Sequence, residues 1–390
     1  FEEALAIATS RSARLAAQRH SVSAAAEQVG RAGELPDPRL KLGIENLPVS
    51  GPNEFRYDRD FMTMRTIGWM QDFPNADKRA ARNLRAERMR DVEQAGLVAQ
   101  GAGVRRETAR AWLDAHYAER ARAVIERLSG QFRLQVEAVA AGVASGRMPA
   151  AERYVLLQAE EQANDRAIGA ARLVTRARIA LEPWVGDAAE RPLGEVPDVT
   201  RFAGSREALL ARYAELPQLQ ALREREELAR AEVELARAGR HADWSLELGY
   251  SLRRPAFSNM LSVMAVLELP VAKERRQDRD VASRLAELER ARAEREDARR
   301  TLQAEIRAAL ADFDTAAVRI ERSRRLLLPL ARQRHEAALA AYRGGSGSLA
   351  GVLEAERART EAELALVEVE AERARAWAEL SFLYPPEAVQ

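Results

Sequence analysis

The sequence predicts a mostly helical protein with two β-hairpins, in which the order helix, hairpin, long helix and shorter return helix occurs twice. Three observations support this fold class. The chain has 390 residues, of which 31% are charged and 5% aromatic, and its excess of Ala, Arg, Glu and Leu is typical of long helices. Two stretches alternate apolar and polar residues with the period of a strand. The third observation is an internal repeat.

The repeat is clearest at the proline that ends each hairpin. Pro74 and Pro270 are separated by an offset of 196 positions, and Glu160 and Glu356 have the same offset. Upstream, RAGELPDPRLKLG resembles RAGRHADWSLELG at an offset of 206, because the first hairpin loop is ten residues longer. The repeat divides the chain into a first half, a linker and a second half, at 1–182, 183–206 and 207–385.

In the first half we expect a helix over 1–33, a hairpin over 39–73 and a long helix over 76–144. The LPDP segment ends the first helix, because proline cannot continue it. Only scattered glycines interrupt the long helix, which at 1.5 Å per residue would extend roughly 100 Å. A turn at SGRMP, 145–149, precedes a return helix over about 150–182.

The second half repeats this order. The first strand of its hairpin, WSLELGYSLRR, alternates apolar and polar residues, and Pro270 ends the second strand. Beyond Pro270 the composition changes to helix-forming residues. We expect a helix over 205–239, a hairpin over 243–270, a long helix over 273–341, a GGSGS turn at 344–348 and a return helix over 349–383.

The hairpin strands indicate a membrane environment. Each is about 9–13 residues long, close to the 9–11 that a tilted barrel strand needs. Four strands with one apolar face would leave open edges and a wet apolar surface in a single chain, and membrane barrels have about eight strands or more. We therefore expect several chains to share one barrel: two would give eight strands and three would give twelve. The alternative is a soluble β-sandwich, but the chain offers no second layer to cover the sheet.

Composition argues against several other classes. A net charge of +1 does not favour nucleic acid, and no run of about 20 apolar residues predicts a transmembrane helix. The chain contains no Cys and begins at Phe1 without a Met or signal peptide, so we expect a mature or trimmed chain.

No feature of the sequence predicts an enzyme or a cofactor. We find no nucleophile–base pair, nucleotide loop or clustered ligands. The GGSGS turn follows a helix and lacks the Lys-Ser/Thr ending of a phosphate loop. The histidines share no ligand spacing, so no specific metal site is expected from them; they are His20, His116, His241 and His335.

The duplicated plan and several segments resemble the TolC-like outer-membrane efflux factors. The segments are LPDPRLKLG and DFPNADKRA in the first half, and LLLPLARQRHEAALAAY and AYRGGSGSLAGVLEAERARTEAEL in the second. The resemblance covers nearly the whole chain. It implies a homotrimer with a twelve-stranded β-barrel in the outer membrane of a Gram-negative bacterium and an α-helical tunnel that extends into the periplasm.

The resemblance also implies partners and a passive role. The family works with a periplasmic adaptor and an inner-membrane pump of the RND type, which supplies the energy for export. The linker and both termini would form an equatorial collar. MRTIGWMQDFPNADKR resembles the cobalt–zinc–cadmium and copper/silver efflux factors, which implies heavy-metal cations as substrate. A drug, small-molecule or protein-secretion duct of the same family, or a soluble coiled-coil adaptor or scaffold, remains an alternative.

By resemblance, the second-half turn should close the periplasmic mouth. The family has a Tyr three residues before a turn Gly, and acidic residues six and nine positions after it. With Gly345 as that glycine, Tyr342 fits the pattern. Glu354 takes the second acidic position, but Gly351 occupies the first. We expect Tyr342, Arg343 and Glu354 to form the gate; the alternative is that Tyr342 packs and Glu354 is solvated.

We expect the adaptor to contact the two turns farthest from the hairpins, because they are the only breaks at that end of the predicted rod. The predicted contact residues are Gly146, Arg147, Met148, Pro149, Gly344, Gly345 and Ser346. Pro329 lies inside the second long helix, where a missing N–H should bend it. That bend would narrow the tunnel inward, or it is only a kink tolerated by packing.

Five of the seven methionines lie in the predicted strands. In the last strand one face is uniformly apolar and should meet lipid, so Met260 and Met264 should face the lumen. The offset of 196 puts Met64 on the same face as Met260. Thioethers are soft ligands suited to Cu(I), although methionine also fills irregular space. We expect no tightly bound metal there.

Overall fold

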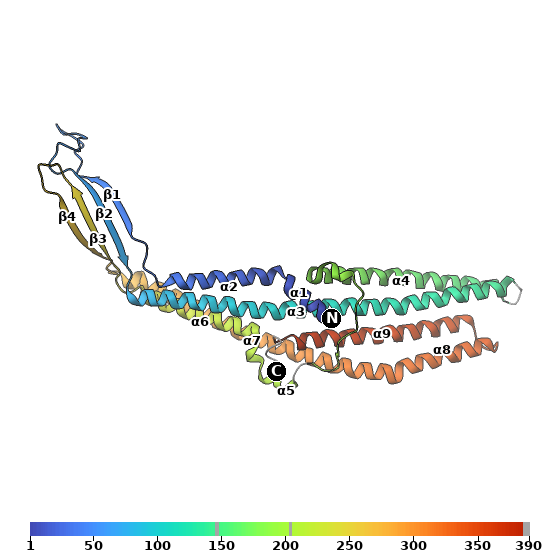
Figure 1. The fold of residues 1–390 in the computed structure, drawn as a ribbon. Coiled ribbons are helices and arrows are strands. Elements are labelled where there is room, and N and C mark those ends of the chain that lie inside the picture. The colour runs from blue at the N-terminus through green and yellow to red at the C-terminus, as the bar shows by residue number, and fades with distance from the viewer. Residues whose placement is uncertain (145–147, 203–204, 385–390) are drawn as a thin grey trace. The chain divides into compact units, whose positions relative to one another are not determined.

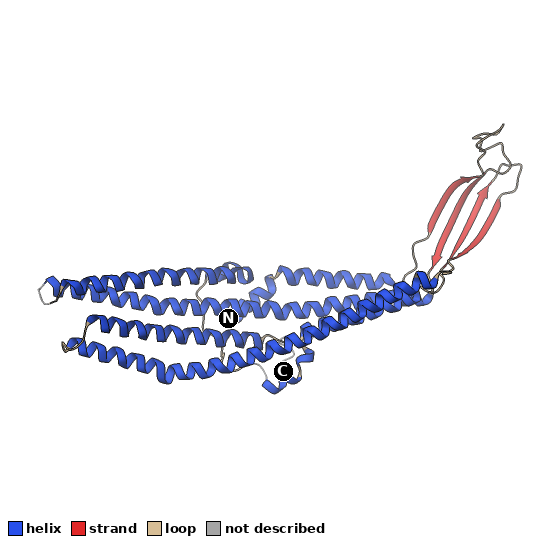
Figure 2. Ribbon diagram, turned by 180° about the vertical axis from the view of Figure 1, so that it is seen from behind, coloured by secondary structure: helices blue, strands red, loops and turns tan. Residues whose placement is uncertain are grey.

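The structure is a computed structural model that describes residues 1–144, 148–202 and 205–384. It divides into two compact units, each of which contains segments from both sequence repeats. The helical unit comprises residues 1–17, 98–217 and 299–390, and the sheet unit comprises residues 18–97 and 218–298. The prediction of a mostly helical protein with a small antiparallel sheet is confirmed (Figure 2).

The described residues of the first half form four helices and two strands, one helix more than expected. They are α1 (Glu2–Arg11), α2 (Ala13–Ala32), β1 (Arg39–Glu45), β2 (Met64–Phe73), α3 (Ala76–Ala144) and α4 (Ala150–Val185). The single helix expected over 1–33 is wrong, because Ser12 is extended with ψ 108°. The Ser12 hydroxyl accepts the Leu15 N–H at 3.3 Å, and serine favours such local caps over a helix interior.

The second half is more interrupted than the sequence predicted. Its elements are α5 (Arg206–Ala211), η2 (Tyr213–Glu215), α6 (Pro217–Ala238), β3 (Trp244–Leu252), β4 (Met260–Leu267), η3 (Lys273–Arg275), α7 (Gln277–Arg322), η4 (Ser323–Leu327), α8 (Leu328–Arg343) and α9 (Leu349–Ser381). The helix expected over 205–239 is broken before Pro217, which starts α6 and suits a first helical turn. The long helix expected over 273–341 begins at Gln277 and contains a π-turn, η4.

The four strands form one antiparallel sheet in the order β1-β2-β3-β4 (Figure 1). The two hairpins are joined through β2 and β3, where Phe73 stacks on Trp244 with ring centroids 4.3 Å apart. Cross-strand partners share a face, so the register collects the apolar residues on one side. One row across all four strands is Leu42, Ile67, Tyr250 and Leu261.

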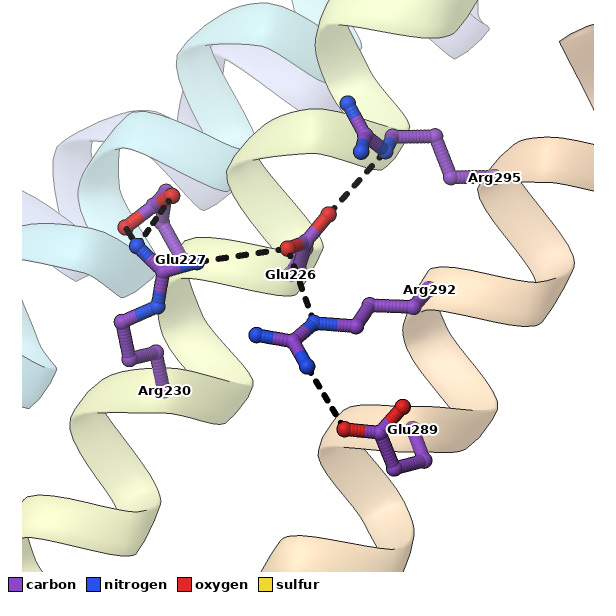
Figure 3. Close-up of polar contacts among 6 residues, drawn as sticks. All are labelled: Glu226, Glu227, Arg230, Glu289, Arg292 and Arg295. Carbon is purple, nitrogen blue, oxygen red and sulfur yellow. Dashed lines mark hydrogen bonds and ion pairs between the residues drawn. The ribbon is translucent and has the colours of Figure 1, made fainter.

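In the sheet unit, α6 and α7 are joined by a buried carboxylate (Figure 3). The Glu226 side chain is 8% exposed and accepts from Arg230 of its own helix and from two arginines of α7. The closest of these is Arg295, whose Nε lies 3.0 Å from Glu226 Oε2. Arg292 is itself shared with the exposed Glu289 at 2.6 Å. A desolvated charge needs several donors to be tolerated, and these arginines supply them.

In the helical unit, α3, α4, α8 and α9 lie side by side (Figures 1 and 2). The linker between the repeats is held on these helices through its backbone carbonyls. Arg373 of α9 donates to Thr200 O at 3.0 Å, and Trp377 Nε1 donates to Arg201 O at 2.8 Å. Arg178 of α4 donates to the carbonyls of Ala189 and Arg191. In the described part of the chain, no helix has a stretch long and apolar enough to span a bilayer.

Candidate functional site

The turn between α8 and α9 is built by glycines. Gly345 has φ 74°, a conformation that favours glycine. The amides of Ser346 and Gly347 both donate to Ala341 O, at 3.0 Å each. A Cβ at Gly347 would lie 2.9 Å from Tyr342 N and 3.0 Å from Ala341, so the chain can turn this tightly only with glycine there. Ser348 then caps α9 by accepting the Gly351 N–H.

The turn between α3 and α4 is described only in part. Gly146 and Arg147, two of the predicted adaptor contacts, lie outside the described residues. Met148 is half-buried and packs against the core of the helical tips. Pro149 precedes α4 as its N-cap, with φ −66°. Gly344, Gly345 and Ser346 at the other turn are exposed.

A shared apolar core holds the two helical hairpins together near their turns. Its buried residues come from three helices, and Tyr342 of α8 packs against it. The buried residues are Leu128, Phe132 and Val139 of α3, Leu156, Ala159 and Ala163 of α4, and Leu349 and Leu353 of α9. The described helix ends next to both turns therefore pack on one shared apolar core.

Tyr342 makes a direct contact between the hairpins. Its hydroxyl donates to Glu152 Oε2 at 2.8 Å, which joins the last turn of α8 to the first turn of α4. Burial, with the hydrogen bond to Glu152 and that residue's negative charge, raises the pKa of Tyr342 to about 12. The phenol therefore stays a neutral donor over the physiological range.

Tyr342 and Arg343 are consecutive, and among the described residues no hydrogen bond or ion pair joins either of them to Glu354. Arg343 is exposed, and Glu354 pairs with Arg334 at 2.5 Å. Sequence reasoning missed Glu152, because it looked for the partner of Tyr342 in the same turn. A signal was present: Glu152 is the third residue after the other predicted turn, so both residues had to lie at the same end of the helices.

Two buried carboxylates of α9 were also missed. Glu356, 2% exposed, accepts from Arg359 Nη2 at 2.5 Å, and His335 Nδ1 of α8 lies 3.0 Å from its Oε2. Glu370 accepts from Arg120 of α3 and Arg324 of η4, both at 2.6 Å. Glu370 therefore joins α9 to α3 and η4 by charge-assisted hydrogen bonds, whereas the arginine that donates to Glu356 belongs to α9 itself.

Pro329 lies in the first turn of α8, directly after the π-turn η4. The Leu328 N–H donates to Ser323 O, five residues back instead of four. The wider turn makes room for a proline ring that would otherwise crowd the carbonyl four residues before it. Figure 1 shows the ribbon bending where α7 is followed by α8.

The polar face of the sheet is the second candidate site. The register places Met64, Met260 and Met264 on this face. Lys41 Nζ of β1 lies 2.5 Å from Glu247 Oε2 of β3 on the same face. The two side chains can meet across β2 because Gly68, which lies between them, has no side chain. Arg39 pairs with Asp72 at 2.7 Å. Among the described residues, no group of three or more His, Cys, Asp or Glu side chains could hold a metal ion.

The opposite face is apolar and uncovered. Its most exposed side chains lie on the edge strands: Leu40 and Leu42 of β1 are 65% and 72% exposed, and Leu261 and Val263 of β4 are 74% and 67% exposed. Aromatic side chains of the same face, Trp69 and Tyr250, are also exposed.

Comparison with known proteins agrees with this architecture. Residues 211–384, slightly less than half of the chain, match the family model described as outer membrane efflux protein. The match covers most of the second repeat. No curated protein sequence matches the chain.

Several solved structures share the fold. A membrane protein from Pseudomonas aeruginosa has a TM-score of 0.83 at 19% identity, covering 98% of this chain and 91% of that one. The outer membrane protein VceC from Vibrio cholerae has a TM-score of 0.80 at 19% identity, with 98% and 95% covered. The CmeC outer membrane channel of Campylobacter jejuni has a TM-score of 0.83 at 14% identity, with 98% and 84% covered.

Proposed function

We propose that the chain is the channel subunit of a tripartite efflux system in the outer membrane of a Gram-negative bacterium. Three copies would close a twelve-stranded barrel, and their helices would form a passive tunnel in the periplasm. One observation carries the proposal: the four-stranded sheet has an exposed apolar face, and in the described chain nothing pairs with the outer edges of β1 and β4. The family match of the second repeat and the shared fold support it.

The two faces of the sheet suit a membrane barrel. Lipid would contact the apolar face, which the chain leaves uncovered. The polar face would line the lumen with the Lys41–Glu247 pair and the hydroxyls of Thr66 and Ser251, whose oxygens are 2.9 Å apart. Closing the edges with further copies removes the unpaired backbone groups that a bilayer would not tolerate.

The helical tips would form the gate and dock the adaptor. Around a threefold axis, three Tyr342–Glu152 contacts would hold the hairpins closed while three exposed Arg343 side chains and three Glu354 carboxylates line the mouth. The exposed turn at Gly344–Ser346 and the segment Gly146–Pro149 would receive the adaptor, and the inner-membrane pump would supply the energy. The bend at Pro329 would narrow the tunnel.

Heavy-metal cations are the substrate class we propose, from the resemblance of MRTIGWMQDFPNADKR to metal-efflux factors. In cells that lack the native gene, restoring the chain should restore tolerance to copper, silver, cobalt or zinc. Restored tolerance to drugs alone would assign the chain to the drug-exporting branch. If Met64 and Met260 contact the cation, Met64→Leu with Met260→Leu should lower copper or silver tolerance, whereas Met89→Leu in α3 should not.

The decisive test of the channel is conductance. The purified chain, reconstituted into planar bilayers, should give discrete channels of low conductance at rest, and Tyr342→Ala with Arg343→Ala should raise that conductance. Absence of channels from a membrane-inserted protein would overturn the proposed function.

Adaptor docking is tested separately. Gly345→Glu and Arg147→Glu should each abolish export while the trimer and its membrane insertion persist. Gly130→Glu is the control, because an added Cβ there has nothing within 4 Å. Export that survives both tip substitutions would place docking elsewhere.

A further inference from the structure

The segments that flank the two edge strands differ in charge: residues 268–276 after β4 carry three basic and two acidic residues, a net charge of +1 (3 − 2), and residues 34–38 before β1 carry two acidic residues. After β4, the chain continues through exposed apolar residues into Lys273, Arg275 and Arg276, which are all exposed; Val271 is 90% exposed. Before β1, Glu34 and Asp37 are exposed on either side of Leu35 and Pro36. Throughout the described residues, none of these five charged side chains has a hydrogen bond or ion pair. In the described structure, each flank therefore carries charged side chains that form no ion pair within the chain.

The sequence repeat provides an internal comparison for the basic flank. In the first repeat, the residues after Pro74 are satisfied within the chain: Asn75 Oδ1 accepts the Lys78 N–H at 2.8 Å and caps α3. Lys78 also pairs with Asp243 at 2.5 Å. This junction passes directly from strand to helix.

The second junction lacks both the cap and the ion pair of the first. At the offset of 196, Val271 stands at the position of Asn75, Lys273 at that of Asp77 and Glu274 at that of Lys78. No side chain caps the start of η3, which occupies Lys273–Arg275 before α7 begins at Gln277. The second junction thus presents an exposed surface with apolar and basic residues where the first junction makes intramolecular contacts.

Sheet topology shows where this surface would lie in an assembly. Every strand is antiparallel to its neighbour, so β1 and β4, at the two edges, run in opposite directions. A second copy that continues the sheet would therefore set its β1 antiparallel to β4. The end of β4 and the start of that β1 then lie at the same end of the sheet.

We propose that Lys273, Arg275 and Arg276 of one copy form ion pairs with Glu34 and Asp37 of a second copy. Leu269 and Val271 would pack against Leu35 of that copy beside the charges. The inference rests on the proposed edge-to-edge assembly and adds the residues that recognise the partner. Charge complementarity carries it: three cations, with Glu274 among them, would lie opposite two carboxylates, and in the described part of the chain neither the cations nor those two carboxylates form an ion pair.

This contact would fix the register of the closing strands. A slip of one residue between β4 and β1 would turn the apolar side chains of one strand towards the polar face of the other. All residues of both edge strands are exposed in one chain, so packing within the chain does not select a register between copies. An ionic contact at one end of the strands would favour one register between β4 and the β1 of the next copy.

A charge exchange tests the proposal. Lys273→Glu with Arg275→Glu, and separately Glu34→Lys with Asp37→Lys, should each lower the trimer association constant in detergent at low ionic strength by about tenfold or more, since every junction of the ring is affected. The combined variant should return to within roughly threefold of the original protein. Salt should shrink all these differences, because exposed charges are screened.

Arg56→Glu with Arg59→Glu is the matched control. It makes the same change in net charge as Lys273→Glu with Arg275→Glu, in the exposed loop at the other end of the same sheet, and it should leave the trimer unchanged. The proposal is overturned if either exchanged pair alone leaves the trimer intact, or if the combined variant is as weak as its parents. It is also overturned if the basic-flank variant loses only binding to phosphatidylglycerol vesicles, which would assign this flank to the membrane surface. A wild-type chain that stays monomeric would overturn the proposed function itself, whereas a failed exchange in a stable trimer overturns only this contact.

Discussion

At the scale of single residues, Tyr342 is the side chain whose removal should be most informative. Tyr342→Phe deletes one hydroxyl and keeps the ring that packs on the tip core. A hydrogen bond to a charged group contributes about 1.5 kcal/mol or more, less where it is partly exposed, so the closed–open equilibrium should shift by up to roughly tenfold. Single-channel recordings should show more frequent opening of an intact trimer. Unchanged opening would mean that the contact does not hold the mouth closed.

The pH dependence of this contact follows from the pKa of Tyr342, which is raised from 10.0 to about 12. A raised pKa means that the folded tip keeps a proton that the unfolded chain loses. The contribution of Tyr342 to stability is therefore complete below pH 10 and falls as the pH rises towards about 12. The difference in opening between wild type and Tyr342→Phe should accordingly be constant from roughly pH 7 to 9. A difference that vanishes within that range would contradict the assignment.

Glu226 and Glu289 form a matched pair for testing burial, because both contact Arg292. Glu226→Gln leaves three arginines facing a neutral amide, and the arginines are partly exposed, so we expect a loss of about 1–3 kcal/mol in the free energy of unfolding. Glu289→Gln, at a side chain 64% exposed, should change it by about 0.5 kcal/mol or less. Chemical denaturation of the detergent-solubilised protein measures both. Equal losses would show that burial does not strengthen the contact.

At the scale of elements, the α8–α9 turn depends on the space at Gly347. Gly347→Ala places a Cβ 2.9 Å from the Tyr342 amide nitrogen, so the turn must shift and should lose protection in amide hydrogen exchange. Gly351→Ala is the control, since its Cβ would make only an ordinary contact with Ser348 at 3.5 Å and alanine favours the helix. A turn that is equally protected in both variants would contradict the steric argument.

The bend between α7 and α8 is also an element-scale property. Pro329→Ala restores an N–H that could return the π-turn to a regular α-helix, although the Arg324–Glu370 contact would resist that change. We expect straightening of the helix, measured as a longer distance between spin labels on α7 and α8. The same variant should raise channel conductance if the bend narrows the tunnel. Straightening without a change in conductance would leave Pro329 as a packing feature.

At the scale of the whole molecule, the open sheet edges predict an obligate oligomer. The chain has a mass of 43.3 kDa, and the proposed trimer should appear at about three times that value in native mass measurements in detergent. A folded monomer would have to expose the apolar face and both edges, which is unfavourable in water and in lipid. A stable, folded monomer in detergent would therefore contradict the proposed assembly.

The sequence alone determined those features that depend on neighbours along the chain. Alternation in WSLELGYSL gave β3, the uninterrupted helix formers gave α3, and Pro270 marked the end of the last strand region. Such periodicities act over a few residues and need no knowledge of packing. The break at Ser12 was missed even though it is local, because its capping tendency competes closely with helix propensity.

Only the tertiary structure decided which distant residues meet. Glu152 lies 190 positions from Tyr342, and Lys41 lies 206 positions from Glu247, and no local pattern pairs them. The pairing of β2 with β3 likewise joins the two repeats through a contact that neither repeat contains alone. These contacts depend on which helix and strand faces are buried together, and burial is set by the packing of the whole chain rather than by the residues on either side.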